Sequence, residues 1–351
     1  MDLFTPFTVK GLTVRNRVVM APMATNMAAA GGFVTAAQIE YYRERARGGT
    51  GMVMVEAVLA ANYPGTASGR LGLWSDEQIG PLGELAAAIA EAGSVPVVQI
   101  IDHSLRASGR RPINLAPAEI QAIIANLARA TERARAAGFA AVDLHACHSA
   151  TLSDFLSRRA NTRTDAYGGS EVGRARIVTE TLAAMRAAVG PDYPLFCRFN
   201  ADEYTVKGNT LKHTIPLSRM LLQAGADVLD VSAGGRHEDG GAQSYSQLRG
   251  RPAAWLPDGA NVYLAAAIKE ATGAPVIAVG KLGDPAAAER ALASGSCDLV
   301  ALGRPLLADP WWVQKVQAGR RAAIKRCRCC DRCMELFREE KPVHCVTFAE
   351  A

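Results

Sequence analysis

Hydrophobic residues along the chain are concentrated in eight short runs that are apolar almost throughout. The runs cover residues 17–23, 51–58, 95–101, 140–146, 194–200, 227–232, 275–280 and 298–304. Uninterrupted apolar runs of this length are typical of strands that are buried on both faces, as in parallel sheets. The segments between them, for example 78–92, 117–137, 173–189, 215–224 and 285–294, have the apolar periodicity of helices.

Strands and helices that alternate eight times predict an α/β fold, a (β/α)8 TIM barrel. A doubly wound open sheet is the alternative, but no Gly-x-Gly-x-x-Gly pattern follows the first run. The length of 351 residues suits one barrel. We predict a barrel over residues 1–318, followed by a short cysteine-rich extension over residues 319–351.

Polar residues and glycines stand where the apolar runs end. The C-terminal ends of barrel strands meet at one mouth, where barrel enzymes carry their chemistry. We therefore expect a polar ligand at this mouth. The residues in question are Pro22, Met23, Ala24, Ala57, Gln99, His145, His148, Arg198, Gly235, His237, Gly280, Lys281, Gly303 and Arg304.

The last two runs end in Gly280-Lys281 and Gly303-Arg304. Glycine lets backbone N–H groups approach an anion closely, and the basic side chains add positive charge. Barrels often bind a phosphate group at this pair of loops. The pattern predicts a phosphate site, which suits phosphosugar isomerases as well as flavin enzymes.

Two polar groups earlier in the barrel each have two interpretations. Arg198 would either stabilise negative charge on a flavin ring, with Gln99 on the same edge, or pair with a carboxylate such as Asp230. His145 and His148 are three residues apart at one strand end, so both rings can face the same pocket. They would either hold a substrate oxygen or bind a metal ion.

Five of the eight cysteines lie in the last 25 residues. Cys327, Cys330, Cys333 and Cys345 give the spacing C-x2-C-x2-C-x11-C. Three ligands on one tight loop and a fourth from a later segment are typical of a 4Fe-4S cluster. A structural zinc site is the alternative, although zinc usually takes two separated pairs.

The composition narrows the class of protein. Hydrophobic residues make up 49% of the chain, no run is long enough to span a membrane, and the N-terminus has no signal peptide. We expect a cytoplasmic protein with free thiols rather than disulfides. The net charge is +5, and no aromatic residues interleave with the basic residues around the cysteines, which disfavours nucleic acid binding. We expect these residues to balance a negatively charged cluster or to dock an acidic redox partner: Arg320, Arg321, Lys325, Arg326, Arg328 and Arg332.

Over nearly its whole length the chain resembles the Old Yellow Enzyme family of FMN-dependent oxidoreductases. With the cysteine tail, it is most similar to the iron–sulfur branch related to 2,4-dienoyl-CoA reductase and trimethylamine dehydrogenase. The block from Asn161 to Gly169 is the most specific part of the match. The other matching stretches are Leu3-Phe4-Thr5-Pro6-Phe7, Asn16-Arg17, Ala21-Pro22-Met23, Tyr41-Tyr42, His145-x-x-His148, Phe155-Leu156-Ser157 and Ala301-Leu302-Gly303-Arg304-Pro305.

The resemblance implies a bound FMN and a 4Fe-4S cluster beside it, with NAD(P)H as a candidate electron donor. It implies that His145 and His148 hold the carbonyl oxygen of an unsaturated substrate. The cluster ligands would be Cys327, Cys330, Cys333 and Cys345. The FMN contacts would be Pro22, Met23, Ala24, Ala57, Gln99, Arg198 and Gly235, with Gly280, Lys281, Gly303 and Arg304 at its phosphate.

The chain departs from the family pattern at several positions. Ala150 stands where relatives have the tyrosine that donates a proton to the substrate, and Ala24 stands where a residue often tunes the flavin. His237 is the replacement proton donor that we predict, with Tyr245 in reserve. The first cysteine in the chain is Cys147, so no residue is available near the first strand to attach FMN covalently.

These observations favour an oxidoreductase that reduces or forms a C=C bond conjugated to a carbonyl or thioester, with hydride transfer through the flavin. The chain ends six residues after Cys345, whereas the relatives continue into a nucleotide-binding domain. We therefore expect a separate redox partner: a flavoprotein subunit, a ferredoxin or an electron-transfer flavoprotein. The alternatives are a non-catalytic electron-transfer subunit, an amine dehydrogenase-like oxidation, and a zinc-containing phosphate-handling lyase or isomerase.

Overall fold

Eight parallel strands form a closed barrel in the computed structural model, which describes residues 1–64, 69–235 and 244–348. The order around the barrel is β10-β3-β4-β5-β6-β7-β8-β9, so neighbouring strands follow one another in the chain. Each of the eight predicted strands is present, which confirms the TIM-barrel prediction. Their bounds are β3 Val18–Met20, β4 Met52–Leu59, β5 Val95–Ile101, β6 Ala141–Ala146, β7 Leu195–Asp202, β8 Val228–Ala233, β9 Val276–Val279 and β10 Leu299–Leu302.

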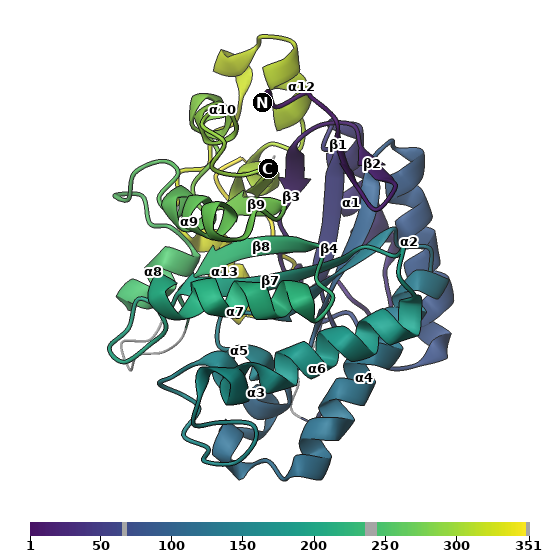
Figure 1. Ribbon diagram of the computed structural model, residues 1–351. Helices are drawn as coiled ribbons and strands as arrows, with labels where there is room; N and C mark the ends of the chain where they lie inside the picture. The colour runs from purple at the N-terminus through teal and green to yellow at the C-terminus, as the bar shows by residue number, and fades with distance from the viewer. Residues whose placement is uncertain (65–68, 236–243, 349–351) are drawn as a thin grey trace.

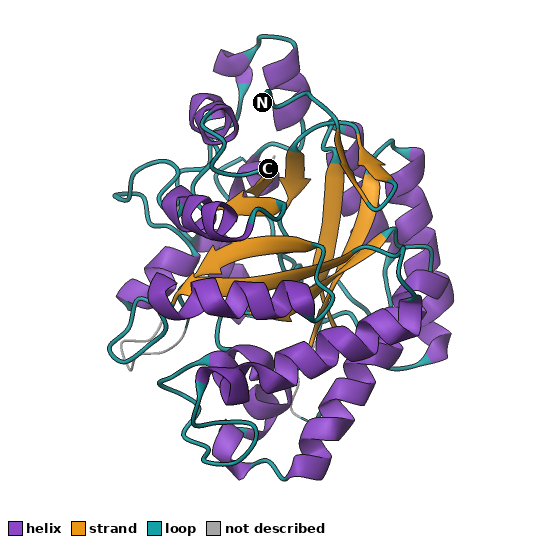
Figure 2. Ribbon diagram, viewed as in Figure 1, coloured by secondary structure: helices purple, strands orange, loops and turns teal. Residues whose placement is uncertain are grey.

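Helices cover the outside of the barrel (Figures 1 and 2). The longer ones are α1 Ala36–Arg47, α2 Ile79–Glu91, α4 Pro117–Ala136, α6 Glu171–Val189, α7 Leu211–Gln223, α9 Val262–Thr272 and α10 Pro285–Ala293. Short helices lie in the loops: α3 Ser104–Ser108, α5 Thr151–Leu156, α8 Tyr245–Gly250, α11 Arg304–Ala308, α12 Trp312–Gln317 and α13 Arg332–Arg338. Short 3-10 turns occupy Ala30–Gly32, Asp76–Gln78, Pro112–Asn114 and Arg321–Ala323. No helix within the described ranges combines the length and the apolar character that a membrane span requires.

An N-terminal hairpin, which the hydrophobic pattern did not predict, precedes the barrel. Strands β1 (Phe7–Val9) and β2 (Leu12–Val14) pair antiparallel through a turn at Lys10 and Gly11, both with positive φ. Each strand has only three residues, too few to produce a recognisable alternation. Phe7 and Val14 are buried in one cluster with Val19 and Leu299, so the hairpin packs against the interior of the barrel at the N-terminal ends of its strands.

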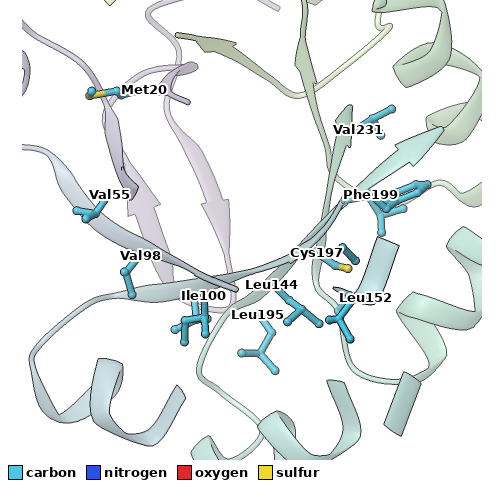
Figure 3. Close-up of a cluster of buried hydrophobic side chains, with 14 of the residues drawn as sticks. Met20, Val55, Val98, Ile100, Leu144, Leu152, Leu195, Cys197, Phe199 and Val231 are labelled. Atoms are coloured by element: carbon cyan, nitrogen blue, oxygen red, sulfur yellow. The ribbon is translucent and has the colours of Figure 1, made fainter. Parts of the chain in front are cut away.

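The largest hydrophobic cluster lies between the strands and the helices around them. Figure 3 shows part of it, with Val98, Ile100, Leu144 and Leu195 projecting from neighbouring strands. All four side chains are fully buried. Close packing on this outer face holds the strands in register, and the register fixes the positions of the loops at the C-terminal mouth.

The block from Asn161 to Gly169 is a loop between α5 and α6, in which Asn161, Arg163, Tyr167 and Gly168 are buried. The side-chain Nδ2 of Asn161 donates to the carbonyl oxygens of Phe155 at 2.7 Å and Tyr167 at 2.8 Å. Its Oδ1 accepts from the backbone N–H of Arg163 at 3.0 Å. These residues line neither of the two cavities described below. The block that carries the family resemblance therefore serves to brace its own loop against α5.

We expect Asn161→Ala to lower the free energy of unfolding by about 2–4 kcal/mol, because three buried backbone groups lose their partner. Chemical denaturation of the purified protein would measure the change. Asn126→Ala is the matched control, since the described partners of the Asn126 side chain are the side chains of Arg129 and Tyr63 and no buried backbone group. Equal stability of the two variants would contradict the bracing role.

Candidate cofactor and substrate site

A cavity of about 430 Å³ opens at the C-terminal ends of the strands. A second cavity of about 230 Å³ adjoins it and shares part of its wall. The shared residues are Pro22, Ala24, Gln99, His145, His148, Gly250, Arg251, Met334 and Phe337. Of the predicted FMN contacts, Ala57 and Gly235 line only the smaller cavity. The remaining ones all line the larger cavity: Pro22, Met23, Ala24, Gln99, Arg198, Gly280, Lys281, Gly303 and Arg304.

The glycines at the ends of β9 and β10 are required by close packing. Gly280 has φ +130°, and a Cβ there would lie 2.8 Å from Nδ2 of Asn261. A Cβ at Gly303 would lie 3.1 Å from the sulfur of Met23. Only glycine leaves the backbone of this end of the cavity open to a ligand.

The two basic side chains at this end already have protein partners. Nζ of Lys281 donates to the carbonyl oxygens of Ala254 and Leu256. Arg304 donates to the carbonyl oxygen of Pro252 at 2.6 Å and to Asp331 at 3.1 Å. Both residues line the cavity, so they add positive charge there while bracing the loops.

Arg198 fits both of the interpretations that the sequence left open. Its Nε lies 3.6 Å from Oδ2 of Asp230, and its side chain lines the larger cavity. Burial alone would lower the pKa of Arg198, but the carboxyl groups of Asp230 and Asp143 raise it above its ordinary value. Arg198 therefore remains a cation facing the cavity. Nε of Arg198, Oδ1 of Asp143 and both Oδ atoms of Asp230 are buried without a hydrogen-bond partner within the described part of the chain.

His145 and His148 lie side by side at the end of β6, with ring centroids 5.5 Å apart, as the spacing predicted. Nε2 of His148 is 2.7 Å from Oγ of Ser232. Nδ1 of His145 is 2.9 Å from Oε1 of Gln99, whose Nε2 donates to Asp143 at 2.6 Å. This order places a hydrogen on Nδ1 of His145 and leaves Nε2 of the neutral ring as an acceptor.

Burial, together with the positive charges of Arg198 and Arg70, lowers the pKa of His145 to about 3. The ring is therefore neutral at physiological pH. A neutral imidazole can donate a hydrogen bond to an oxygen without transferring a proton to it.

Cys147 lies between the two histidines. Its sulfur is 3.2 Å from Nδ1 of His148 and 3.7 Å from both ring nitrogens of His145. Among the described residues, these three form a group whose potential metal ligand atoms lie within 4.8 Å of one another. Sequence reasoning weighed a two-histidine metal site and overlooked this third ligand, although His-x-Cys-His stands in the sequence. Arg198 and Arg70 disfavour a proton on His145, and the same positive field disfavours a metal cation.

Among the residues that the structure describes, no predicted proton donor lines either cavity. Ala150 lines the smaller cavity and is 3% exposed, so no phenol stands there. His237 lies outside the described residues. Tyr245 is 47% exposed, packs against Tyr204 and Trp255, and is absent from both cavity walls.

The cysteine segment folds back over the mouth of the barrel. The N–H of Val343 donates to the carbonyl oxygen of Thr25 at 2.8 Å, and Nδ2 of Asn26 donates to that of Phe337 at 2.9 Å. Arg251, after α8, forms an ion pair with Asp331. The segment therefore forms part of the cavity wall.

Three tail cysteines, Cys327, Cys329 and Cys333, line the larger cavity. Burial raises the pKa of Cys333, and the nearby thiols of Cys330 and Cys345 raise it further. Cys329, which the spacing leaves outside the predicted ligand set, donates its N–H to the sulfur of Cys327 at 3.4 Å. A hydrogen bond between the side chains of Cys327 and Cys329 lowers the pKa of the Cys329 thiol to about 6.

Comparison with known proteins agrees with this geometry. The model of the NADH:flavin oxidoreductase / NADH oxidase family matches residues 2–111 and 105–323. An NADH oxidase of Thermoanaerobacter brockii is 36% identical over 357 residues, covering 94% of this chain and 53% of that protein. A metal reductase of Desulforamulus reducens is 33% identical, covering 99% and 54%. The chain thus spans about half the length of these two relatives. An NADPH dehydrogenase of Bacillus subtilis is 31% identical, covering 89% and 93%.

Two solved structures cover nearly all of the chain. A 2-naphthoyl-CoA reductase in complex with 2-naphthoyl-CoA is 28% identical with a TM-score of 0.89, covering 98% of this chain and 56% of that one. The 6-hydroxypseudooxynicotine amine oxidase of Pseudomonas geniculata N1 is 25% identical with a TM-score of 0.84, covering 98% and 53%.

Proposed function

The chain belongs to the NADH:flavin oxidoreductase / NADH oxidase family, and from this membership we propose that it is an FMN- and 4Fe-4S-dependent oxidoreductase. The reaction that the site supports best is reduction of a C=C bond conjugated to a carbonyl or thioester, with NADH or NADPH as the candidate donor. The observation that carries the proposal is the pair of histidines, His145 and His148, on the wall of both cavities at the strand ends, with the ring of His145 kept neutral by its lowered pKa.

The residues at the larger cavity fit FMN. Gly280 and Gly303 leave the backbone open where a phosphate would bind, and Lys281 and Arg304 supply positive charge. Arg198 remains a cation that lines this cavity while its Nε pairs with Asp230, which suits a ring edge that becomes negative on reduction. FMN, when bound, supplies the hydride-accepting and hydride-donating centre. The ring contacts that we propose are Pro22, Met23, Ala24, Ala57, Gln99, Arg198 and Gly235.

On the substrate side, His145 and His148 would hold the carbonyl oxygen. Negative charge develops on this oxygen when a hydride adds to the conjugated double bond, and fixed hydrogen-bond donors stabilise it. The charge of Arg198 behind the pair adds to the stabilisation.

Donation from Nε2 of His145 requires the hydrogen to be on that nitrogen. Burial and the charge of Asp230 raise the pKa of Asp143 well above its ordinary value, which favours its protonated form. If the Gln99 amide turns over, it accepts from Asp143 and donates to Nδ1 of His145. The chain from Asp143 through Gln99 then holds His145 in the tautomer that donates into the cavity.

The four cysteines Cys327, Cys330, Cys333 and Cys345 are the proposed cluster ligands. Their support is the spacing, the nearness of Cys333 to Cys330 and Cys345, and the position of Cys327 and Cys333 on the wall of the FMN cavity. A cluster held there would exchange single electrons with the flavin. Exposed basic residues on the same segment, such as Arg320 and Arg328, suit an acidic redox protein as the further partner.

A second candidate function is amine oxidation. The likeness to the 6-hydroxypseudooxynicotine amine oxidase favours it, because that chain matches nearly all of this one. The missing phenol at Ala150 also removes the usual proton source for alkene reduction. His237 remains our proposed donor, and its position is outside the described residues.

An absorption spectrum of the anaerobically purified protein, with counts of FMN, iron and zinc, tests the cofactors. We expect flavin bands over a broad cluster absorption near about 400 nm, and bleaching of the flavin on addition of NADH or NADPH. The reduced protein is then mixed with enones and enoyl-CoA thioesters, and the oxidised protein is mixed with amines. A colourless, zinc-loaded protein would end the proposal. If no alkene reoxidises the reduced flavin and an amine reduces the oxidised flavin, the amine reaction is favoured.

A further inference from the structure

Cys147 is a fully buried thiol that lines neither cavity. Its sulfur contacts the rings of both His145 and His148, and the distance of 3.2 Å to Nδ1 of His148 is the shortest of these contacts. The proposed function assigns no task to this thiol. It nevertheless touches a side chain that would hold the substrate oxygen.

The thiol of Cys147 keeps its hydrogen at neutral pH. Burial raises the pKa of Cys147 well above its ordinary value, although the positive charge of Arg198 acts in the opposite direction. The ordinary pKa of a cysteine, about 8.5, already lies above neutral pH. The side chain therefore has one hydrogen to donate and a sulfur that can accept.

Arg198 determines where the thiol hydrogen points. The side chains of Arg198 and Cys147 form a hydrogen bond. Because a guanidinium group has only donors, the sulfur is the acceptor in this bond. The thiol hydrogen is then left for Nδ1 of His148, which is nearer to the sulfur than either ring nitrogen of His145. Nδ1 accepts in this arrangement, so the ring hydrogen of His148 is on Nε2.

The hydroxyl group of Ser232 does not select this tautomer by itself. Its Oγ lies 2.7 Å from Nε2 of His148, and Ser232 is buried and lines neither cavity. A hydroxyl group can donate or accept, so this contact permits the hydrogen of the ring on either nitrogen. With the hydrogen on Nδ1, Nε2 would be an acceptor and would repel a carbonyl oxygen. The thiol of Cys147 disfavours that tautomer.

The backbone that carries His148 is strained. His148 and Ser149 have φ of +56° and +57°, a left-handed conformation that is unfavourable for residues other than glycine. The N–H of Ala150 donates to the carbonyl oxygen of Cys147 at 3.2 Å and closes the turn. The ring of His148 thus projects from a strained turn, with one nitrogen at Cys147 and the other at Ser232.

We propose that Cys147 is a positioning residue for the acceptor step, whose thiol donates to Nδ1 of His148 and keeps the ring hydrogen on Nε2 for the substrate oxygen. This inference rests on the proposed function, since it concerns the histidine pair of the same site. It differs from a metal-binding role, in which the thiol would lose its hydrogen. Each ring then has its own support, Gln99 for His145 and Cys147 for His148.

The test follows the acceptor half-reaction of the FMN-loaded protein, which is photoreduced without oxygen and mixed with 2-cyclohexen-1-one at several concentrations. We expect Cys147→Ala to lower the limiting rate by about tenfold. Flavin reduction by NADH or NADPH, and the enone concentration at half the limiting rate, should change by less than about twofold, because the hydrogen bond strengthens only as charge develops.

Two further substitutions separate the donor from the volume of the side chain. Cys147→Val fills the space of the sulfur without a hydrogen-bond donor, and it should be as slow as Cys147→Ala. Cys147→Ser keeps a donor at the same position, so it should restore the limiting rate to within about threefold of the original. Cys297→Ala is the matched control, because Cys297 is also fully buried and lines neither cavity. It should leave the acceptor step unchanged.

A double-mutant cycle shows whether the thiol acts through the ring. In a His148→Ala background, Cys147→Ala should change the limiting rate by less than about twofold, because the ring that it positions is absent. A thiol that only supports the fold would slow both backgrounds equally.

An unchanged rate in Cys147→Val, or a loss that Cys147→Ser does not reverse, would overturn the inference and leave the proposed function standing. An equal loss with and without His148 would also overturn it, because the thiol would then act by another route. The proposed function fails separately, if neither 2-cyclohexen-1-one nor an enoyl-CoA thioester reoxidises the reduced flavin of the unaltered protein. The inference would fail with it.

Discussion

His145→Ala is expected to slow the acceptor half-reaction by about 10²–10³-fold while leaving flavin reduction by NADH or NADPH nearly unchanged. The reason is that His145 would act only on the oxygen that becomes negative as the hydride arrives. Rapid mixing of photoreduced protein with an enone measures the acceptor step alone. His148→Ala should have an effect of the same kind, since its ring lies beside that of His145.

The pH dependence provides a second check on the role of His145. Its pKa, lowered to about 3 by burial and by Arg198 and Arg70, keeps the ring neutral between about pH 5 and 8. His145 should therefore contribute no inflection near pH 6.5 to the pH profile of the acceptor step. Any inflection seen there should be the same in the unmodified protein and in His145→Ala. An inflection that disappears in His145→Ala would mean that His145 donates a proton rather than a hydrogen bond.

His213→Ala is the matched control for both measurements. His213 is a half-buried histidine on α7. Its ring contacts Arg158 and Thr210, and it lines neither cavity. A loss in His145→Ala no larger than that in the control would refute the oxygen-holding role.

The barrel was predictable from sequence because every strand is buried on both faces. Strand β4, for example, has eight consecutive buried residues, and all of them except Glu56 are apolar. The N-terminal hairpin left no such trace, because its strands are three residues long and only Phe7 and Val14 are buried. The hydrophobic pattern reveals an element only when buried positions recur along it, and each strand of the hairpin has only one buried position.

Those parts of the site were predictable whose residues all lie at the end of one strand. His145 and His148 are close in sequence and close in space, as are Gly280 and Lys281. The presence of both Arg70 and Arg338 at the smaller cavity was not predictable from the sequence. These residues are far apart in the chain and both reach the cavity only after the barrel has closed and the C-terminal segment has folded over its mouth. Arg70 and Arg106 also lie in loops, where sequence patterns say little about direction.

The C-terminal cysteine segment lines both cavities, so it contributes to the proposed substrate site as well as to the proposed cluster site. Cys327 and Cys333 line the larger cavity, whereas Phe337 and Met334 line both. Helix α13 therefore lies between the proposed cluster and the proposed substrate. Electron entry and acceptor binding would share one short helix, so changes at the cysteines are expected to reach the substrate side as well.

Cys333→Ser is expected to reduce the iron content from about four atoms per chain to nearly none, because serine oxygen replaces a ligand that lies near Cys330 and Cys345. FMN should remain bound, since its proposed contacts are on the barrel strands. Iron analysis and the loss of cluster absorption measure the first effect, and the remaining flavin spectrum measures the second.

Cys329→Ser is the matched control in the same loop. The cysteine spacing does not make Cys329 an iron ligand. If Cys327, Cys330, Cys333 and Cys345 are the ligands, we expect the iron content of Cys329→Ser to differ from the normal content by no more than about 10%. Cys329 lies against the sulfur of Cys327 and lines the same cavity, whereas Cys330 is exposed. Loss of iron in Cys329→Ser with retention in Cys330→Ser would exchange these two residues in the ligand set. Retention of iron in Cys333→Ser would remove the tail from cluster binding altogether.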